Sequence, residues 1–263
     1  MQKNIMKPNE AETSLLVLCS QGNLEAIEAL FAGGRSIGTQ FLELGLLTSC
    51  RDYKVLGEHQ EIIQLLINKG ASVNVAEPGS GLTPLMIACA KGLSHVAEVL
   101  LDNRADVDQI DSSGRSAIFF VLEKEHGENI ELVSLLLEHG CKLNVRSSTG
   151  MTPLLLAFSR NLEKSALLML KKGAQLEDRD THGNSLLHLA VMNDSEVLTR
   201  ELLRLGMRSV RNINDDGRTP SVLASDRLLQ ACEELGLSDA QVNLEGLAKG
   251  SDKTSKASQT TSQ

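Results

Sequence analysis

The strongest constraint on this chain is a short pattern that recurs about every thirty-three residues. A hydroxyl residue followed by an apolar run appears at spacings of 33, 36, 33 and 34 residues: Thr83, Ser116, Thr152, Ser185 and Thr219. A second position lies 21 residues after the hydroxyl in four units: Thr13 to Gly34, Thr83 to Arg104, Thr152 to Gly173 and Ser185 to Gly206. Two sequence features that recur with the same spacing predict repeated units, each of which buries its apolar faces against its neighbours.

The residues of each unit predict two short helices. The Thr or Ser hydroxyl can accept hydrogen bonds from the free amides of a first helical turn, which stabilises the helix by ~1 kcal/mol. A Pro follows Thr83, Thr152 and Thr219, at the helical position where its missing N–H costs nothing. An apolar helix such as 154–158 and an amphipathic helix such as 131–137 complete the unit.

Turn residues separate the units. Gly140, Gly173 and Gly206 follow the second helix, where a glycine with positive φ commonly ends a helix. Three segments ahead of the next hydroxyl begin with Asp or Asn and end with Gly, which is typical of type I turns: 111–114, 180–183 and 214–217.

These units resemble the ankyrin repeat. Its Asp-x-x-Gly-x-Thr-Pro-Leu-His-x-Ala line is matched by Gly81-Leu82-Thr83-Pro84-Leu85-Met86-Ile87-Ala88 and by Gly183-Asn184-Ser185-Leu186-Leu187-His188-Leu189-Ala190. Its repeat end is matched by Gly70-Ala71-Ser72-Val73-Asn74. The resemblance implies an all-α ankyrin-repeat solenoid of about six to seven helix-turn-helix repeats with finger loops, which holds another protein on its concave face.

The repeats set the expected domain boundaries. Residues 1–12 form a polar N-terminal segment, and the ankyrin-repeat domain spans 13–236, with repeats near 13–38, 39–74, 75–110, 111–145, 146–178, 179–212 and 213–236. Residues 237–263 form a polar tail, which its composition predicts to be disordered from 251. A finger is expected to be missing between Gly34 and Thr39, and insertions in repeats 2 and 4 are expected at the turn between the two helices.

Composition narrows the class of function. A formal charge of −8 argues against broad binding to nucleic acid or anionic membranes, and without Trp and with one Tyr the chain has few rings on which bases could stack. The five cysteines are too far apart for a metal ribbon or redox pair. The N-terminal residues lack the apolar stretch of a signal peptide, and no apolar run could span a bilayer. We expect a monomer in the cytoplasm or nucleus.

The sequence contains only weak matches to the motifs of catalytic and metal-binding sites. His139-Gly140-Cys141 places an imidazole beside a thiol, but adjacent side chains rarely aim at one site, and helix-end roles are the better interpretation. Cys19 and Cys89 fit small core positions. His188 fits a structural hydrogen bond to the repeat hydroxyl better than a ligand role. We therefore expect no enzymatic activity, and no cofactor or metal.

Ankyrin proteins contact partners with finger tips and the exposed end of the first helix of each repeat. Carried over by position, the resemblance implies these partner-binding residues: Lys91, Arg115, Lys124, Met151, Arg160, Thr181, His182, Asn184, Asn193, Arg218 and Arg227. Along the fingers and inner helices that carry these positions, six residues are basic and four are acidic (Glu123, Asp215, Asp216 and Asp226), and this excess of about two positive charges favours a partner with an acidic or extended segment. Such charges can equally form a solvated face.

Three function classes stay open at this point. The first is an intracellular adaptor, scaffold or inhibitor that binds a protein. The second is a secreted bacterial effector that binds host proteins, with the polar tail 251–263 as its export signal. RNA or nucleotide binding is the third and is disfavoured, because it needs a basic groove with exposed aromatic rings.

Overall fold

The computed structural model describes residues 9–34, 36–54, 58–123, 127–207 and 213–223, which form helices and no strand. The chain divides into two compact units, Met1–Ser148 (unit 1) and Thr149–Gln263 (unit 2). Unit 1 contains α1 (Glu10–Gln21), α2 (Leu24–Ala32), α3 (Thr39–Arg51), α4 (His59–Asn68), α5 (Pro84–Lys91), α6 (Ser94–Asp102), α7 (Ala117–Leu122) and α8 (Ile130–Glu138). Unit 2 contains α9 (Pro153–Ser159), α10 (Glu163–Lys171), α11 (Leu186–Met192), α12 (Glu196–Arg204) and α13 (Pro220–Leu223).

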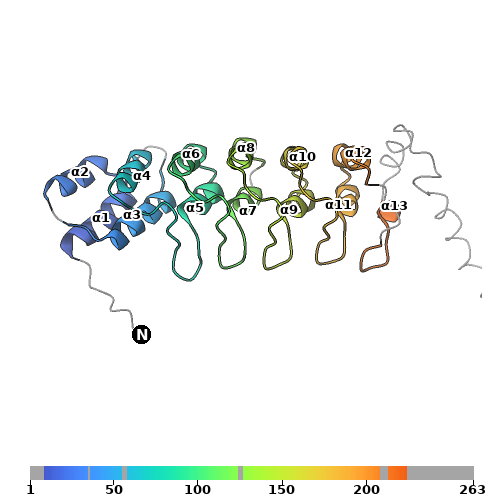
Figure 1. Ribbon diagram of the computed structural model, residues 1–263, viewed down its shortest axis with the longest axis horizontal. Helices are drawn as coiled ribbons and strands as arrows, with labels where there is room; N and C mark the ends of the chain where they lie inside the picture. Colours follow the sequence, from blue (N-terminus) through green and yellow to red (C-terminus); the bar gives the residue numbers. More distant parts are fainter. Residues whose placement is uncertain (1–8, 35, 55–57, 124–126, 208–212, 224–263) are drawn as a thin grey trace, which may run out of the picture. The chain divides into compact units, whose positions relative to one another are not determined.

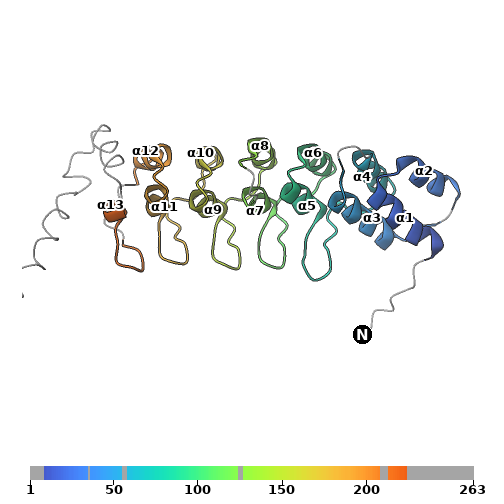
Figure 2. The same ribbon diagram turned by 180° about the vertical axis from the view of Figure 1, so that it is seen from behind.

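Both units are built from two rows of helices. In unit 1 the inner row is α1, α3, α5 and α7, and each of these helices packs on the next and on its own outer partner, α2, α4, α6 or α8 (Figures 1 and 2). In unit 2 the inner row is α9, α11 and α13, and the outer row is α10 and α12. Finger loops leave the inner row on the side away from the outer row (Figure 1). The predicted all-α repeat architecture is confirmed.

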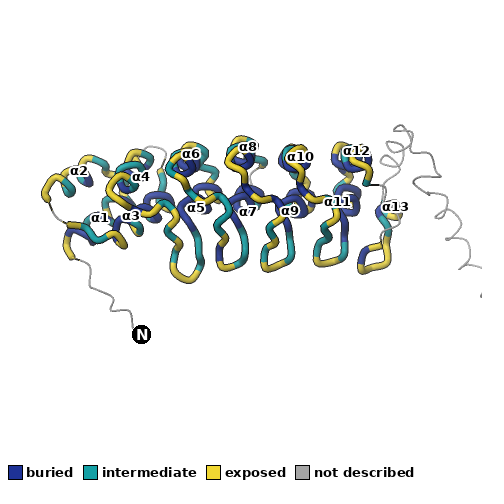
Figure 3. The backbone as a smooth tube through the Cα atoms, viewed as in Figure 1, coloured by how far each residue is buried: buried dark blue, intermediate teal, exposed yellow. Residues whose placement is uncertain are grey.

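The core lies between the rows and between successive repeats. Apolar side chains such as Leu15, Ile62, Leu100 and Leu136 in unit 1 are fully buried, whereas the finger tips are exposed or half-buried (Figure 3). The core is mainly aliphatic because the chain has few aromatic residues. Small residues let neighbouring helices approach closely: a Cβ added at Gly45 of α3 would lie 3.2 Å from Cys19 Sγ of α1.

Helix caps follow the predicted pattern in some repeats and not in others. Thr83 and Thr152 accept from the amides of Met86 and Leu155, each at 3.3 Å. Ser116 makes no such bond, and its buried hydroxyl has no hydrogen-bond partner among the described residues.

The predicted caps of the first two repeats are wrong. Helix α1 begins at Glu10, so the repeat starts ahead of the predicted boundary at 13. Asn9 accepts from the Glu12 amide and Glu12 accepts from the Asn9 amide, both at 2.8 Å, so this reciprocal pair caps the helix four residues ahead of Thr13. The Thr13 hydroxyl instead donates to the Asn9 carbonyl from within the helix. Gly38, not Thr39, precedes α3.

The predicted insertions are placed in part as expected. The short link between α2 and α3 carries no finger in the described residues. Helix α3 has 13 residues where α5 has 8, so about half of the extra length of repeat 2 extends this helix, and only the rest lies in the turn. The insertion of repeat 4 falls between α7 and α8, as predicted, although its residues 124–126 lie outside the described residues.

The ends of the outer helices adopt left-handed backbone, as predicted. The φ angles of Gly140, Gly173 and Gly206 are 76°, 83° and 85°. Arg104 occupies the same place in repeat 3 with φ 66°, a conformation that costs a residue with a side chain about 1–2 kcal/mol.

Arg104→Gly is therefore expected to raise the free energy of unfolding by up to about 1 kcal/mol, because the gain is partly offset by the greater freedom of glycine in the unfolded chain. Urea denaturation measures it. Arg104→Ala, which removes the guanidinium and keeps the strained φ, is the matched control. Equal stability of the two variants would show that φ at this position has no energetic consequence.

The four described cysteines, Cys19, Cys50, Cys89 and Cys141, are free thiols within the core of unit 1. Burial raises the pKa of Cys19 to about 11 and the pKa values of Cys50 and Cys141 to about 12, and it raises the pKa of Cys89 as well. They are structural, as predicted for Cys19 and Cys89.

In a Cys232→Ser background, a thiol reagent at pH 8 is expected to modify these four residues about a hundredfold or more slowly in the folded than in the unfolded protein, because the reactive thiolate is scarce and covered. Absorbance of the released thiol product gives the rate. Any of the four that reacts at the unfolded rate would contradict its burial.

Candidate functional site

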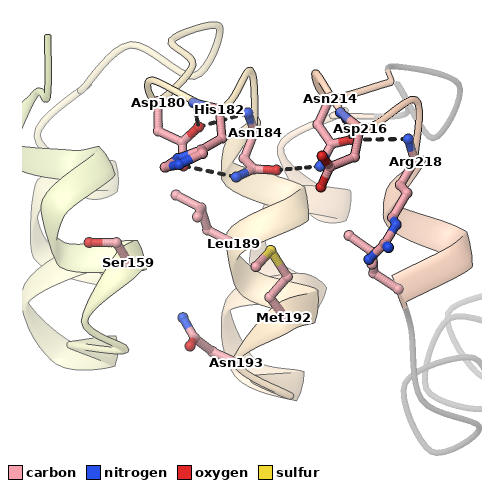
Figure 4. Close-up of a pocket in the computed structure, with 11 residues that line it drawn as sticks. Ser159, Asp180, His182, Asn184, Leu189, Met192, Asn193, Asn214, Asp216 and Arg218 are labelled. Atoms are coloured by element: carbon pink, nitrogen blue, oxygen red, sulfur yellow. Dashed lines mark hydrogen bonds between the residues drawn. The ribbon is translucent and has the colours of Figure 1, made fainter.

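The inner side of unit 2 has an open hollow of about 370 Å³. Its walls come from the end of α9, from the finger and inner helix of repeat 6, and from the finger and α13 of repeat 7 (Figure 4). The lining residues are Ser159, Asp180, His182, Asn184, Leu189, Met192, Asn193, Asn214, Asp216, Arg218 and Leu223.

A chain of hydrogen bonds holds the two fingers beside the hollow. Asp180 accepts from the His182 and Asn184 amides at 2.9 and 2.8 Å and from the Asn184 side chain at 2.9 Å. The Asn214 side chain donates to Asn184 Oδ1 at 2.8 Å, and its own Oδ1 accepts from the amide of Arg218 at 2.9 Å. The finger carbonyl of His182 accepts from the Asp215 amide at 3.0 Å. The dashed lines of Figure 4 follow this ladder from one finger to the next.

His188 connects the inner helix to the same finger. Its Nδ1 lies 3.2 Å from the Ser185 amide, which can only donate, so Nδ1 is the acceptor and Nε2 carries the hydrogen. The Ser185 hydroxyl also lies 2.8 Å from Nδ1, and Nε2 donates to the Arg218 carbonyl at 3.0 Å. The prediction that His188 is a structural link is confirmed.

The predicted partner-binding residues are divided between the two units. Four of them line the hollow: His182, Asn184, Asn193 and Arg218. Exposed Thr181 adjoins His182, while Met151 and Arg160 belong to unit 2 without lining the hollow. Lys91 and Arg115 belong to unit 1. The last two, Lys124 and Arg227, lie outside the described residues.

Several predicted contact residues already have partners within the protein: Asn193 donates to the Phe158 carbonyl at 2.7 Å, and the polar groups of Asn184 and Arg115 are engaged more fully. Asn184 is buried, and both ends of its amide are hydrogen-bonded in the ladder. The Arg115 guanidinium donates to Asp111 and Glu123 at 2.8 to 3.0 Å and stacks 4.5 Å from the centroid of the Phe120 ring. The hydrogen bonds of Asn184 and Arg115 depend on neighbouring segments that the repeat pattern does not identify. We therefore remove both residues from the candidate surface.

The predicted excess of basic residues can be followed only in part in the described residues. Two of its six cations, Lys124 and Arg227, lie outside them, and the charge of Arg115 is balanced by Asp111 and Glu123. The remaining cations are Lys91, Arg160 and Arg218. The summed charge of the predicted contact residues therefore gives little information about a partner. The individual residues that line the hollow give more.

Met192 is the functional candidate that the sequence prediction missed. Its side chain lines the hollow and 56% of the residue is exposed, although methionine is usually buried. Aligning the repeats places Ala90 and Ser159 at the same position, so a large apolar residue at the end of α11 was the available signal. Leu189 and Leu223 add apolar surface to the same hollow.

His139 and Cys141 do not form a reactive pair. His139 is exposed at the end of α8, and Cys141 is buried behind it. In the described residues no three His, Cys, Asp or Glu side chains gather as a metal site. None of the described helices is long and apolar enough to cross a bilayer.

Comparisons with known proteins agree with the geometry. The family description "Ankyrin repeats (3 copies)" matches residues 15–111, 53–147 and 105–180. Human Rabankyrin-5 is 34% identical over an alignment 141 residues long, which covers 49% of this chain and 12% of that protein. The phosphocholine transferase AnkX of Legionella pneumophila is 24% identical over 160 residues, 60% of this chain and 17% of that protein. The putative ankyrin repeat protein FPV031 of fowlpox virus is 26% identical over 173 residues, 59% of this chain and 50% of that protein.

The chain thus spans only a minor part of Rabankyrin-5 and AnkX, 12% and 17% of their lengths. The matched profile covers more than half of the chain, and the helix pairs, finger turns and left-handed glycines follow the same period. The protein belongs to the ankyrin-repeat family.

Proposed function

We propose that the chain is a non-catalytic adaptor, scaffold or inhibitor, which acts in the cytoplasm and holds a segment of another protein in the hollow of unit 2. The observation that carries the proposal is the hydrogen-bonded ladder from Asp180 through Asn184 to Asn214. It fixes the finger backbone beside exposed side chains, so little order has to be imposed on binding, and preorganised surfaces bind more tightly for a given area.

The exposed residues of the hollow have the composition of a binding site. His182 and Arg218 are polar and exposed, and Met192 offers a flexible apolar surface beside them. Arginine is enriched among residues that dominate binding energy, and methionine adapts to different partners. Of the other predicted contacts, we retain Thr181, Asn193, Met151, Arg160 and Lys91 as secondary candidates, outside the central set.

Affinity purification with quantitative mass spectrometry tests the site. The triple variant His182→Ala/Met192→Ala/Arg218→Ala is expected to lose about tenfold or more of the partner captured by the unchanged protein, because truncated central contacts typically cost more than 1 kcal/mol each. Lys171→Ala/Lys172→Ala, on the exposed end of α10, is the matched control and should capture the partner normally. Equal capture by both variants would rule out the hollow as the binding site.

A bacterial effector is the second candidate, and the similarity to AnkX of Legionella pneumophila over 60% of this chain is the observation in its favour. The tail 251–263, proposed as its export signal, lies outside the described residues. Deleting Ser251–Gln263 should abolish secretion from a bacterial host if the tail directs export. Unchanged secretion, or its absence in the intact protein, would exclude that role.

A further inference from the structure

Two arginines occupy the same position in different repeats and have different surroundings. Arg115 follows the finger glycine of repeat 4, and Arg218 follows the finger glycine of repeat 7. The first residue of each finger turn is Asp111 in repeat 4 and Asn214 in repeat 7. The side chain four residues ahead of the arginine is therefore a carboxylate in one repeat and an amide in the other.

Arg115 has its counter-charges within the protein. Asp111 Oδ2 accepts from Nε at 3.0 Å and from Nη2 at 2.8 Å, and Glu123 accepts from Nη1 at 2.9 Å. Asp111 has a nearly buried side chain, with 2% exposed, so this is a fixed ion pair. A guanidinium donates in this forked manner to carboxylates because its N–H groups lie in one plane.

In Arg218, the groups that form hydrogen bonds with the described residues are those of the backbone. Its amide donates to Asn214 Oδ1 at 2.9 Å, and its carbonyl accepts from His188 at 3.0 Å. The Asn214 amide is already used by the ladder, because its nitrogen donates to Asn184. Among the described residues the exposed guanidinium of Arg218 has no ion-pair or hydrogen-bond partner. A fixed backbone therefore presents at the hollow a planar cation that has no counter-charge within residues 9–34, 36–54, 58–123, 127–207 and 213–223.

The nearby Asp216 does not take the place of the missing carboxylate. Figure 4 shows the Asp216 side chain at the level of the finger ladder, whereas Arg218 extends from its finger toward the level of Met192. Asp180, the other acid of the hollow, has both carboxylate oxygens occupied by the ladder. The acids of the hollow thus leave the guanidinium available.

The surface next to Arg218 is apolar. Met192 is 56% exposed, and Leu189 and Leu223 line the same hollow. We infer that the hollow recognises an extended peptide segment in which an Asp or Glu stands next to an apolar residue, so that the partner supplies to Arg218 the carboxylate that Asp111 supplies to Arg115. The inference rests on the proposed function and names the chemistry of its partner.

Selection from a displayed library of random, unphosphorylated peptides tests this on the full chain. The unchanged protein and the control Lys172→Glu are expected to select peptides with Asp or Glu beside an apolar residue. Arg218→Glu is expected to select Lys or Arg at the acidic position. Arg218→Ala should weaken a selected acidic peptide by about tenfold to a hundredfold, and the affinity of the unchanged protein should fall with added salt.

The possible results separate the two proposals. In one result, Met192→Asp no longer binds the selected peptides, but Arg218→Glu does not reverse any preference for charge. This result would overturn the carboxylate inference and leave the hollow as the binding site. Peptides that bind both variants unchanged, or no bound peptide at all, would overturn both proposals. Each variant is first checked by thermal unfolding, and Arg218→Ala replaces Arg218→Glu if the charge reversal destabilises the fold.

Discussion

Replacing Gly22 by Ala is expected to lower the free energy of unfolding by about 3 kcal/mol, one of the two largest effects expected here. Gly22 lies in the turn between α1 and α2 with φ 73°, which costs a residue with a side chain about 1–2 kcal/mol. The added Cβ would also lie 2.3 Å from Cε1 and 2.7 Å from Nδ1 of the buried His59 ring. A clash of this kind in a packed core typically costs about 1–3 kcal/mol.

Gly140→Ala is the matched control. Gly140 has nearly the same φ, 76°, and an added Cβ would meet nothing within 4 Å. Urea denaturation should therefore show a loss of only about 1–2 kcal/mol for this variant. In a His59→Ala background, Gly22→Ala should cost about the same as Gly140→Ala, because the clash is gone. Equal losses for the two glycines in the unchanged background would contradict the close approach of His59 to Gly22.

The second large effect concerns the pH dependence of stability. His59 is fully buried, and neither ring nitrogen makes a hydrogen bond of ordinary distance and angle among the described residues. Burial lowers the pKa of His59, as does the charge of Lys54, while the Ser20 backbone and Asp52 act in the opposite direction. The ring also lies 5.5 Å from the ring of Tyr53, between centroids. The folded protein therefore keeps His59 neutral at a pH where the unfolded chain binds a proton.

The sign of the effect follows from proton binding. As the pH falls below the unfolded value of 6.5, the unfolded state takes up a proton that the folded state excludes, so stability is lost. The loss from this residue is at most about 1.4 kcal/mol for each pH unit. It should be full-sized only down to the lowered pKa of the folded protein, below which both states are protonated.

Denaturation of the unchanged protein and of His59→Leu between pH 7.5 and pH 5 measures this term. Other histidines contribute equally to both proteins, so the difference between the two curves isolates His59. The advantage of the leucine variant should grow as the pH falls. Parallel curves would show that His59 does not titrate differently in the two states.

The sequence predicts what depends on local spacing. Thr83 and Thr152 cap their helices because the hydroxyl, the proline and the amide three residues on belong to one turn. The left-handed glycines and the turns beginning at Asp111, Asp180 and Asn214 are local in the same sense. The predicted cap at Thr13 is wrong because Asn9 and Glu12 form a reciprocal cap earlier in the chain. The repeat spacing carries no information about this pair.

Burial within the candidate site could not be predicted from one repeat at a time. Asn184 looked like a finger-tip contact, but Asn214 of the next repeat, 30 residues on, covers its amide. Arg115 was predicted to contact a partner, but its guanidinium donates to Glu123, the residue that follows α7. Arg218 stands at the same position with Asn214 in place of the first acid, while Asp226, at the place of Glu123, lies outside the described residues. The difference lies in Asn214 replacing Asp, a single residue that acquires meaning only when the repeats are compared side by side.

Site-specific photo-crosslinking in cells tests whether the hollow of unit 2 holds a partner protein. A photoreactive phenylalanine analogue replaces Met192, which is exposed in the hollow of unit 2, or Lys172, which is exposed at the end of α10, and the crosslinked products are identified by mass spectrometry. We expect a specific protein adduct at position 192 that is absent at position 172 and is lost when Arg218→Glu is added. An adduct formed equally at both positions, or at 172 alone, would contradict it.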